Sequence, residues 1–477
     1  MKIPENTFAE EKLKEKARKI AVKEGSAYSF MDGFGLKYIT PYALSLGANN
    51  FHIGLLSSLP VLVGNFSQML TIKVMNYWTR KKLVFTSVLL QAIMWLFLIG
   101  AGAAYYLFEI NGNKMPWILI IIYTLLITLG AFSGPAWASW MRDIVTEKRG
   151  DYFGNRNRIV GGVALICMLI AGFILDYFKG TSIFIGYTII FSIAFLGRFV
   201  SAVLFLKQYE PKFKADKRAY FTLVQFIKKM RLSNFGRFVI FVTLTLFAVN
   251  IASPFFAVYM LKDLGFSYTI YMVVILSSSV SSLLFMPVWG KFSDDYGNIK
   301  TIKITSKLIP LVPFLWIFTI YIKRSEFMVP YLIIVEIFSG MIWAGFNLAV
   351  GNFIYDAVSR EKIAICSSYF NILSSIGTLI GALLGGFIAS HEISFFGLNQ
   401  ILVLFVMSGV LRYLVYATMK NDITEVREVL DFNGSAGKEI AKITKEKLKV
   451  NKIKNKIESI KKLELIQSLD YRNLLKM

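Results

Sequence analysis

The chain carries little charge, and very little cysteine or histidine, for its length. Only 17% of its 477 residues are charged, whereas 55% are hydrophobic. Soluble domains are about a quarter charged, so this composition excludes a disordered polypeptide. The two cysteines, Cys167 and Cys366, lie far apart within apolar runs. A disulfide framework and a thiolate metal site are therefore not expected.

The two histidines and the glycine-rich segments offer no catalytic chemistry. His52 and His391 fall near the predicted ends of apolar runs and form no cluster for metal binding or acid–base catalysis. Residues 433–438 (NGSAGK) lack the full spacing of a phosphate-binding loop and follow no predicted strand. A membrane-bound transferase would need acidic or histidine clusters beside a donor-binding loop, and none is evident. We therefore predict no metal, no cofactor and no enzymatic activity.

Apolar runs of membrane-spanning length fill most of the sequence. A spanning helix needs about 20 mainly apolar residues. We predict an all-α membrane protein with twelve transmembrane helices in two blocks of six. The predicted spans are 25–47, 51–73, 84–107, 116–139, 157–177, 182–206, 236–261, 268–290, 303–322, 330–352, 365–388 and 398–419.

Positive charge is concentrated on alternate loops. Lys and Arg number 53 against 30 Asp and Glu, which gives a net charge of +23. The excess lies after spans 2, 4 and 6 and in the C-terminal tail, so by the positive-inside rule both termini are cytoplasmic. We expect a multi-pass protein of the plasma membrane. Its excess of positive charge indicates how the chain is oriented in the membrane and does not indicate nucleic-acid binding. The expected parts are an N-terminal cytoplasmic segment (1–24), a six-helix bundle (25–207), a cytoplasmic central loop (208–235), a second bundle (236–420) and a basic cytoplasmic tail (421–477).

The tail from residue 438 to 477 alternates basic and apolar residues with helical spacing. This pattern is compatible with a helix lying on the anionic inner leaflet of the bilayer. It is equally compatible with a solvated segment that touches no lipid.

The two blocks of six spans match each other. Asp32 aligns with Asn250 and Lys82 with Lys300, each 218 positions further along the chain. Asp143 aligns with Asp356 at a spacing of 213. Parallel six-helix repeats are a transporter architecture with the binding site between the halves.

Two loops resemble signatures of the major facilitator superfamily. Residues 290–300 (GKFSDDYGNIK) resemble its Gly-x-x-x-Asp-Arg-x-Gly-Arg-Arg loop, and residues 140–154 (WMRDIVTEKRGDYFG) are similar to its Asp…Arg-Gly…Gly stretch before the fifth helix. The first-half loop departs from the pattern, with Asn76 where the family has Asp, and Asp295 replaces the usual Arg. The resemblance covers roughly residues 25–420.

The resemblance implies roles for these loops in switching conformation. In the family, the loop Asp lies against the positive end of a neighbouring helix and holds one side shut, and here Asp294 takes that place. Glycines at 290 and 297 would let the backbone turn. The alternative is that Asp294 only caps the following helix. The switch residues implied by the resemblance are Asp143, Arg149, Gly150, Gly290, Asp294, Gly297 and Asp356.

A few polar residues lie inside the predicted spans, where an ionisable group is costly and suggests function. Asp32 and Lys37 share span 1, five residues and about 140° apart on a helix. In the family, spans 1, 4, 7 and 10 line the cavity. The candidates for a substrate or proton site are Asp32, Lys37, Asn65, Gln68, Asn250, Glu336, Trp343 and Asn347. Interhelical packing is the alternative role for such residues.

These observations predict a monomeric secondary active transporter that moves a small solute by alternating access. Either Asp32 or Glu336 is expected to carry a coupled proton, because a partly dry cavity favours the neutral form of a carboxylate. A membrane sensor or interaction protein built on the same fold, which binds a ligand without moving it, remains the alternative.

Overall fold

The computed structural model is all-helical over the residues that it describes. These residues are 5–107, 114–147, 149–211, 221–322, 325–359, 362–391, 398–430, 437 and 439–445. Most of the tail (421–477) and the loop residues Lys323 and Arg324 therefore lie outside the described residues. Within the described ranges no β-strand is present.

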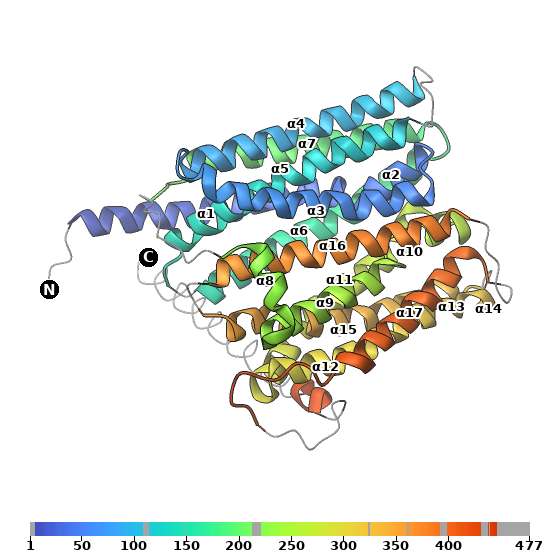
Figure 1. Ribbon diagram of the computed structural model, residues 1–477. Helices are drawn as coiled ribbons and strands as arrows, with labels where there is room; N and C mark the ends of the chain where they lie inside the picture. The colour runs from blue at the N-terminus through green and yellow to red at the C-terminus, as the bar shows by residue number, and fades with distance from the viewer. Residues whose placement is uncertain are drawn as a thin grey trace, which may run out of the picture.

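The first half of the molecule runs from α1 to α7 (Figure 1). Its elements are α1 (Glu5–Phe34), the 3-10 helix η1 (Leu36–Tyr38), α2 (Ile39–Ser45), α3 (Asn50–Val74), α4 (Arg80–Tyr106), α5 (Met115–Ile144), α6 (Arg149–Phe178) and α7 (Ile183–Lys207). The predicted spans 2–6 each coincide with one of these helices, from α3 to α7.

The second half follows α8 (Leu223–Lys229) and the 3-10 helix η2 (Met230–Leu232). Its elements are α9 (Asn234–Asn250), α10 (Phe255–Val258), the π-helical η3 (Tyr259–Asp263), α11 (Tyr268–Tyr296), α12 (Asn298–Leu308), α13 (Leu311–Ile317), α14 (Thr319–Ile322), α15 (Met328–Ala357), α16 (Ile363–Ala389) and α17 (Gln400–Met419). Predicted spans 7 and 9 are runs of short helices, and spans 8, 10, 11 and 12 are single helices.

Eleven helical stretches of the described chain are long and apolar enough to cross a membrane. The predicted first span (25–47) is the twelfth crossing, and it is interrupted. Helix α1 ends at Phe34, Gly35 separates it from η1, and α2 completes the path across the bundle. This architecture confirms the predicted fold of twelve transmembrane helices.

The interruptions recur in both halves. In the second half, α9 ends at Asn250, and α10 begins after Pro254, near the position related to Gly35 by the 218-residue repeat. A third break separates α12 from α13 at Pro310. Proline has no N–H to donate, so it interrupts the helical ladder. Discontinuous helices at matching positions are typical of the binding regions of transporters.

The long helices run between two faces of the bundle (Figure 1). We call the face where α1 begins and α17 ends the terminal face, and the opposite one, with the turns after α2, α4 and α6, the far face. The halves meet along α3 with α16 and along α6 with α11. Gly54 permits the first contact, because a Cβ there would lie 2.4 Å from the carbonyl oxygen of Ala382.

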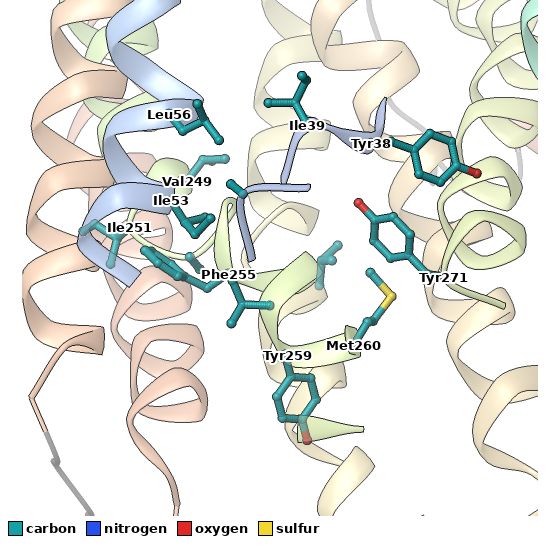
Figure 2. Close-up of a cluster of buried hydrophobic side chains, with 14 of the residues drawn as sticks. Tyr38, Ile39, Ile53, Leu56, Val249, Ile251, Phe255, Tyr259, Met260 and Tyr271 are labelled. Carbon is teal, nitrogen blue, oxygen red and sulfur yellow. The ribbon is translucent and has the colours of Figure 1, made fainter. Parts of the chain in front are cut away.

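An apolar cluster joins the halves near the breaks in α1 and α9. Figure 2 shows side chains from η1, α2 and α3 facing side chains from the second half. Tyr38, Ile39, Ile53, Phe255 and Met260 are each no more than 2% exposed. Burial of this surface, at about 25 cal/mol per Å² of apolar area, holds the halves together on the far-face side of the bundle centre.

Candidate functional site

A cavity of about 420 Å³ lies between the two halves, and we call it the central cavity. Its walls come from α1, η1 and α6 of the first half and from α11 and α15 of the second. The polar and aromatic side chains in these walls are Asp32, Lys37, Ser278, Ser279, Ser282 and Trp343. A ligand held there would touch both halves at once.

The structure brings three of the predicted site residues together in this cavity. Asp32 lies in the last turn of α1, Lys37 lies in η1 beyond the break, and Trp343 approaches from α15. Asp32 is half-buried and Lys37 is exposed. Across the described residues, neither charge has a hydrogen bond or an ion pair with another part of the chain.

Glu336 lies next to the central cavity rather than in its wall. Its Oε1 accepts a hydrogen bond from Trp316 Nε1 at 3.2 Å, and the Ser278 side chain lies beside the carboxylate. Gly340, one turn further along α15, packs against the Ser278 carbonyl. Through Ser278, the carboxylate is therefore one side chain away from the cavity.

The remaining predicted site residues lie elsewhere. Asn65 Nδ2 donates to the Asn371 carbonyl at 3.2 Å, and Gln68 Nε2 lies 3.5 Å from Asn65 Oδ1, so this pair bridges α3 and α16. Asn250 donates to Leu246 within α9 and lies 3.4 Å from Thr378 Oγ1 on α16. Their contacts are those of interhelical packing.

Asn347, a further predicted site residue, does not line the cavity. It is exposed on α15.

Sequence reasoning missed the serine wall of the cavity. Ser278, Ser279 and Ser282 belong to the run 277–282 (SSSVSS) within α11. Five serines in six residues of a membrane span were the available signal. No three metal-ligating side chains come together in the part of the chain that the structure describes.

The first-half loop on the terminal face carries an ion network around Arg80. The guanidinium is 1% exposed, and its Nη1 lies 2.6 Å from Asp143 Oδ2. Glu210 accepts the Arg80 backbone N–H at 2.9 Å and lies 3.6 Å from Nε. Asp143 therefore ties α5 to the start of α4.

The second-half loop repeats this network with one exchange of roles. Asn298 occupies the position of Arg80, and its Nδ2 donates to Asp356 Oδ2 at 2.6 Å. The guanidinium comes instead from Arg427, beyond the last helix, with Nε 3.1 Å from the same oxygen. Glu425 accepts the Ile299 backbone N–H at 2.9 Å, as Glu210 does at Arg80.

The residues of the signature loop itself behave differently from one another. Gly297 adopts φ +91°, and a Cβ there would lie 2.5 Å from Glu425 Oε2, so the predicted turn is confirmed. The turn predicted at Gly290 is wrong, because this residue lies inside α11 with open space around it. Glycine permits a tight turn but does not require one, and here the helix continues through Gly290.

Asp294 is exposed in the last turn of α11 and bonds to none of the described residues. It does not cap α12, whose N-cap, Gly297, provides no side-chain hydrogen bond. Arg149 and Gly150 open α6, and the Arg149 side chain is outside what the structure describes.

A carboxylate on the far face joins the two halves through hydrogen bonds to backbone N–H groups. Asp176, near the end of α6, accepts the backbone N–H groups of Tyr268 at 2.7 Å and Thr269 at 2.8 Å. These are the first N–H groups of α11, where the helix dipole favours negative charge. Asn50 Nδ2 adds a bond to the Ala389 carbonyl at 2.6 Å. Together these contacts join the two halves at the far face.

A second buried network holds the first half together. Glu24 and Arg198 are 3% and 5% exposed, and Arg198 Nη1 lies 3.8 Å from Glu24 Oε1. Ser201 donates to the same oxygen at 2.8 Å, while Arg156 lies 3.4 Å from Oε2. The network joins α1, α6 and α7, which is a structural role.

Arg412, the repeat-related partner of Arg198, bonds to backbone carbonyls instead. Its Nη1 donates to the Ile309 carbonyl at 3.4 Å. The helical donor to that carbonyl would be residue 313, a proline without an N–H.

Comparisons with known proteins place this geometry in a family. No curated protein sequence matches the chain significantly. Among solved structures, the chain is similar to a single-residue mutant of the nucleoside transporter NupG, at 14% identity and a TM-score of 0.65 over 84% of this chain and 100% of that one.

The chain is also similar to a bacterial homologue of the iron transporter ferroportin in an inward-facing state, at 12% identity and a TM-score of 0.61 over 85% and 99% of the two chains. A bacterial homologue of the human lysosomal transporter Spinster, inward-facing and unoccupied, matches at 13% identity and a TM-score of 0.57 over 87% and 99%. The family model of the Major Facilitator Superfamily matches residues 25–381 and 238–454. The chain therefore belongs to the Major Facilitator Superfamily.

Proposed function

We propose that this protein is a secondary active transporter that moves a small solute across the membrane by alternating access. The central cavity carries the proposal, because its walls come from both halves and it contains an unpaired carboxylate and an unpaired ammonium. The contacts of Asp176 and Asn50 keep the far face closed. The solute would enter this state from the terminal face, which the charge distribution assigns to the cytoplasm of a plasma-membrane protein.

Coupling to protons would use Glu336 rather than Asp32. The Glu336 carboxylate is held by the Trp316 indole, and no cation among the described residues pairs with it. A carboxylate inside a membrane span that has no neighbouring cation is a candidate carrier of a coupled proton. Asp32 instead lines the central cavity together with Lys37, a side chain of opposite charge.

The ion networks on the terminal face would keep each half rigid while the protein changes between the two states. Asp143 with Arg80, and Asp356 with Arg427, each tie the end of one spanning helix to a neighbouring segment. Rocking of the halves about the central cavity would leave each network intact within its own half, so each half moves as a rigid body. The exposed Asp294 is available for a latch when the terminal face closes.

Counterflow and uphill uptake in proteoliposomes test the transport and coupling steps separately. Proteoliposomes that contain the protein are given a radiolabelled mixture of amino acids, nucleosides and sugars, with and without an imposed pH gradient. We expect exchange without the gradient and accumulation with it. Glu336→Gln should abolish accumulation and keep exchange, while Glu326→Gln, an exposed carboxylate of the far face, should change neither.

Two results would contradict the proposal. A protein that binds a solute of the mixture without exchanging it is a sensor, not a transporter. Accumulation that persists in the Glu336→Gln variant would show that Glu336 does not carry the coupled proton.

A further inference from the structure

We propose that the central cavity binds a zwitterionic solute, one that carries an ammonium and a carboxylate on a short scaffold, as an α-amino acid does. The inference rests on the proposed function of this cavity as the transport site. It is carried by the placement of Asp32 and Lys37, which line the same cavity and are joined neither to each other nor to any other described residue.

The chain itself keeps these two charges apart. They are five residues apart, about 140° around a regular helix. The helix also breaks at Gly35, so that Asp32 ends α1 while Lys37 belongs to η1. A Cβ at Gly35 would lie 2.2 Å from the Trp95 ring, so packing against α4 fixes the break. The two groups are thus held as separate binding points.

Charge complementarity distinguishes between classes of solute. A neutral solute would displace water from both charges without offering either a partner, and unpaired charges removed from water are costly. An anion would suit Lys37 but place like charge near Asp32, and a cation would do the reverse. A zwitterion satisfies both groups and leaves the occupied site electrically neutral, so specificity follows from attraction and repulsion together.

The opposite wall suits the rest of such a molecule. Ser279 and Ser282 offer hydroxyls that can donate and accept hydrogen bonds, and Trp343 offers an apolar ring surface. A volume of about 420 Å³ is at the lower end of the range of about 300–1,000 Å³ for small-molecule pockets. The solute is therefore small, with room for a side chain of moderate size.

The charges and the hydroxyls also come from different halves. Asp32 and Lys37 belong to the first half, whereas the serines and Trp343 belong to the second. A zwitterion bound to the charged pair would present its substituent to α11 and α15. The solute would thereby stabilise states in which the halves approach each other around it.

Thermal stabilisation of the purified full chain, followed by counterflow, tests the inference. The probes are a mixture of the twenty protein amino acids, their methyl esters, which lack the carboxylate, and their N-acetyl derivatives, which lack the ammonium. We expect the free amino acids to stabilise the protein at concentrations at least tenfold lower than either derivative. Asp32→Asn should reduce the discrimination against the N-acetyl derivatives to less than threefold, and Lys37→Gln should do the same for the methyl esters.

Lys23→Gln is the matched control. Lys23 is an exposed lysine of α1 outside the cavity, and its replacement should preserve the discrimination. If a cavity variant fails to fold, the double exchange Asp32→Lys with Lys37→Asp keeps both charges and should retain zwitterion binding.

The outcomes separate this inference from the proposed function. Exchange of a neutral or singly charged solute, without zwitterion binding, overturns the inference but still supports the proposed transport function. Zwitterion binding without exchange supports the inference and overturns transport. If no free amino acid stabilises the protein, or if both cavity variants keep the tenfold discrimination, the zwitterionic class is wrong.

Discussion

Arg427 lies 3.1 Å from Asp356 and thereby supplies to the second half the guanidinium that Arg80 supplies to Asp143 in the first. The second half has Asn298 at the position equivalent to Arg80. The segment after α17 provides the guanidinium instead. It also bonds to the signature loop, because the Leu430 N–H donates to the Asp295 carbonyl at 3.0 Å.

Replacing Arg427 should loosen the start of α12 and the segment that follows α17. The pair is partly exposed, so Arg427→Gln should cost about 0.5–1 kcal/mol. Hydrogen–deuterium exchange of residues 421–430 and 298–303 should accelerate about two- to fivefold. Glu428→Gln changes an exposed neighbour without a side-chain contact in the described chain and should leave exchange unchanged. If Arg427→Gln leaves exchange unchanged, the guanidinium plays no part in holding this segment.

Replacing Asp176 should open the far face. Asp176→Ala removes the acceptor of two backbone N–H groups at the start of α11, and charged hydrogen bonds of this kind contribute about 1.5–3 kcal/mol. Spin labels at Thr181 and Ser325, which are exposed on the far face of opposite halves, would report the separation. In a background without Cys167 and Cys366, the population with the longer distance between the two labels should be at least fivefold larger in Asp176→Ala than in its parent.

The control for this measurement is Asp422→Asn. Asp422 is an exposed carboxylate on the terminal face, and only its backbone N–H is hydrogen-bonded. The label distances should not change in this variant. Unaltered distances in Asp176→Ala would show that the carboxylate is not a latch.

Neutralising Glu24 should strongly destabilise the first half. Glu24→Gln leaves the buried guanidinium of Arg198 without its acidic partner, and breaking a buried pair costs about 3–5 kcal/mol. The apparent melting temperature in detergent should fall accordingly. Removing both charges, in Glu24→Gln with Arg198→Met, should restore part of the loss.

The comparison for Glu24 is Glu15→Gln on the exposed part of α1. Glu15 makes a solvent-exposed pair with Lys19 at 2.7 Å, and its loss should not change the melting temperature measurably. Equal melting temperatures for the wild type and Glu24→Gln would refute the structural role of the buried pair.

The sequence predicted the spans and three residues of the cavity. Long apolar runs specify transmembrane helices by themselves, because every backbone polar group in the bilayer must be satisfied within the helix. Asp32 and Lys37 stood out for the same reason, since a charge in such a run is costly. The repeat also predicted which loops would match, and Asp143 and Asp356 do lie in equivalent networks.

The sequence did not distinguish polar residues that line the cavity from those that pack helices. Asn65, Asn250 and Ser278 look alike in a span, yet only Ser278 lies in the cavity wall. Helix rotation decides this difference, and rotation is fixed by close contacts such as that of Gly54 with Ala382.

The sequence alone thus determined the class of fold, the number of crossings and the family, because these follow from local hydropathy, charge and motif. Only the tertiary structure decided which charges meet. Asp176 capping α11, and Arg427 completing the network of Asp356, join segments more than 70 residues apart. Such pairings depend on how whole helices pack, and no local pattern of residues specifies them.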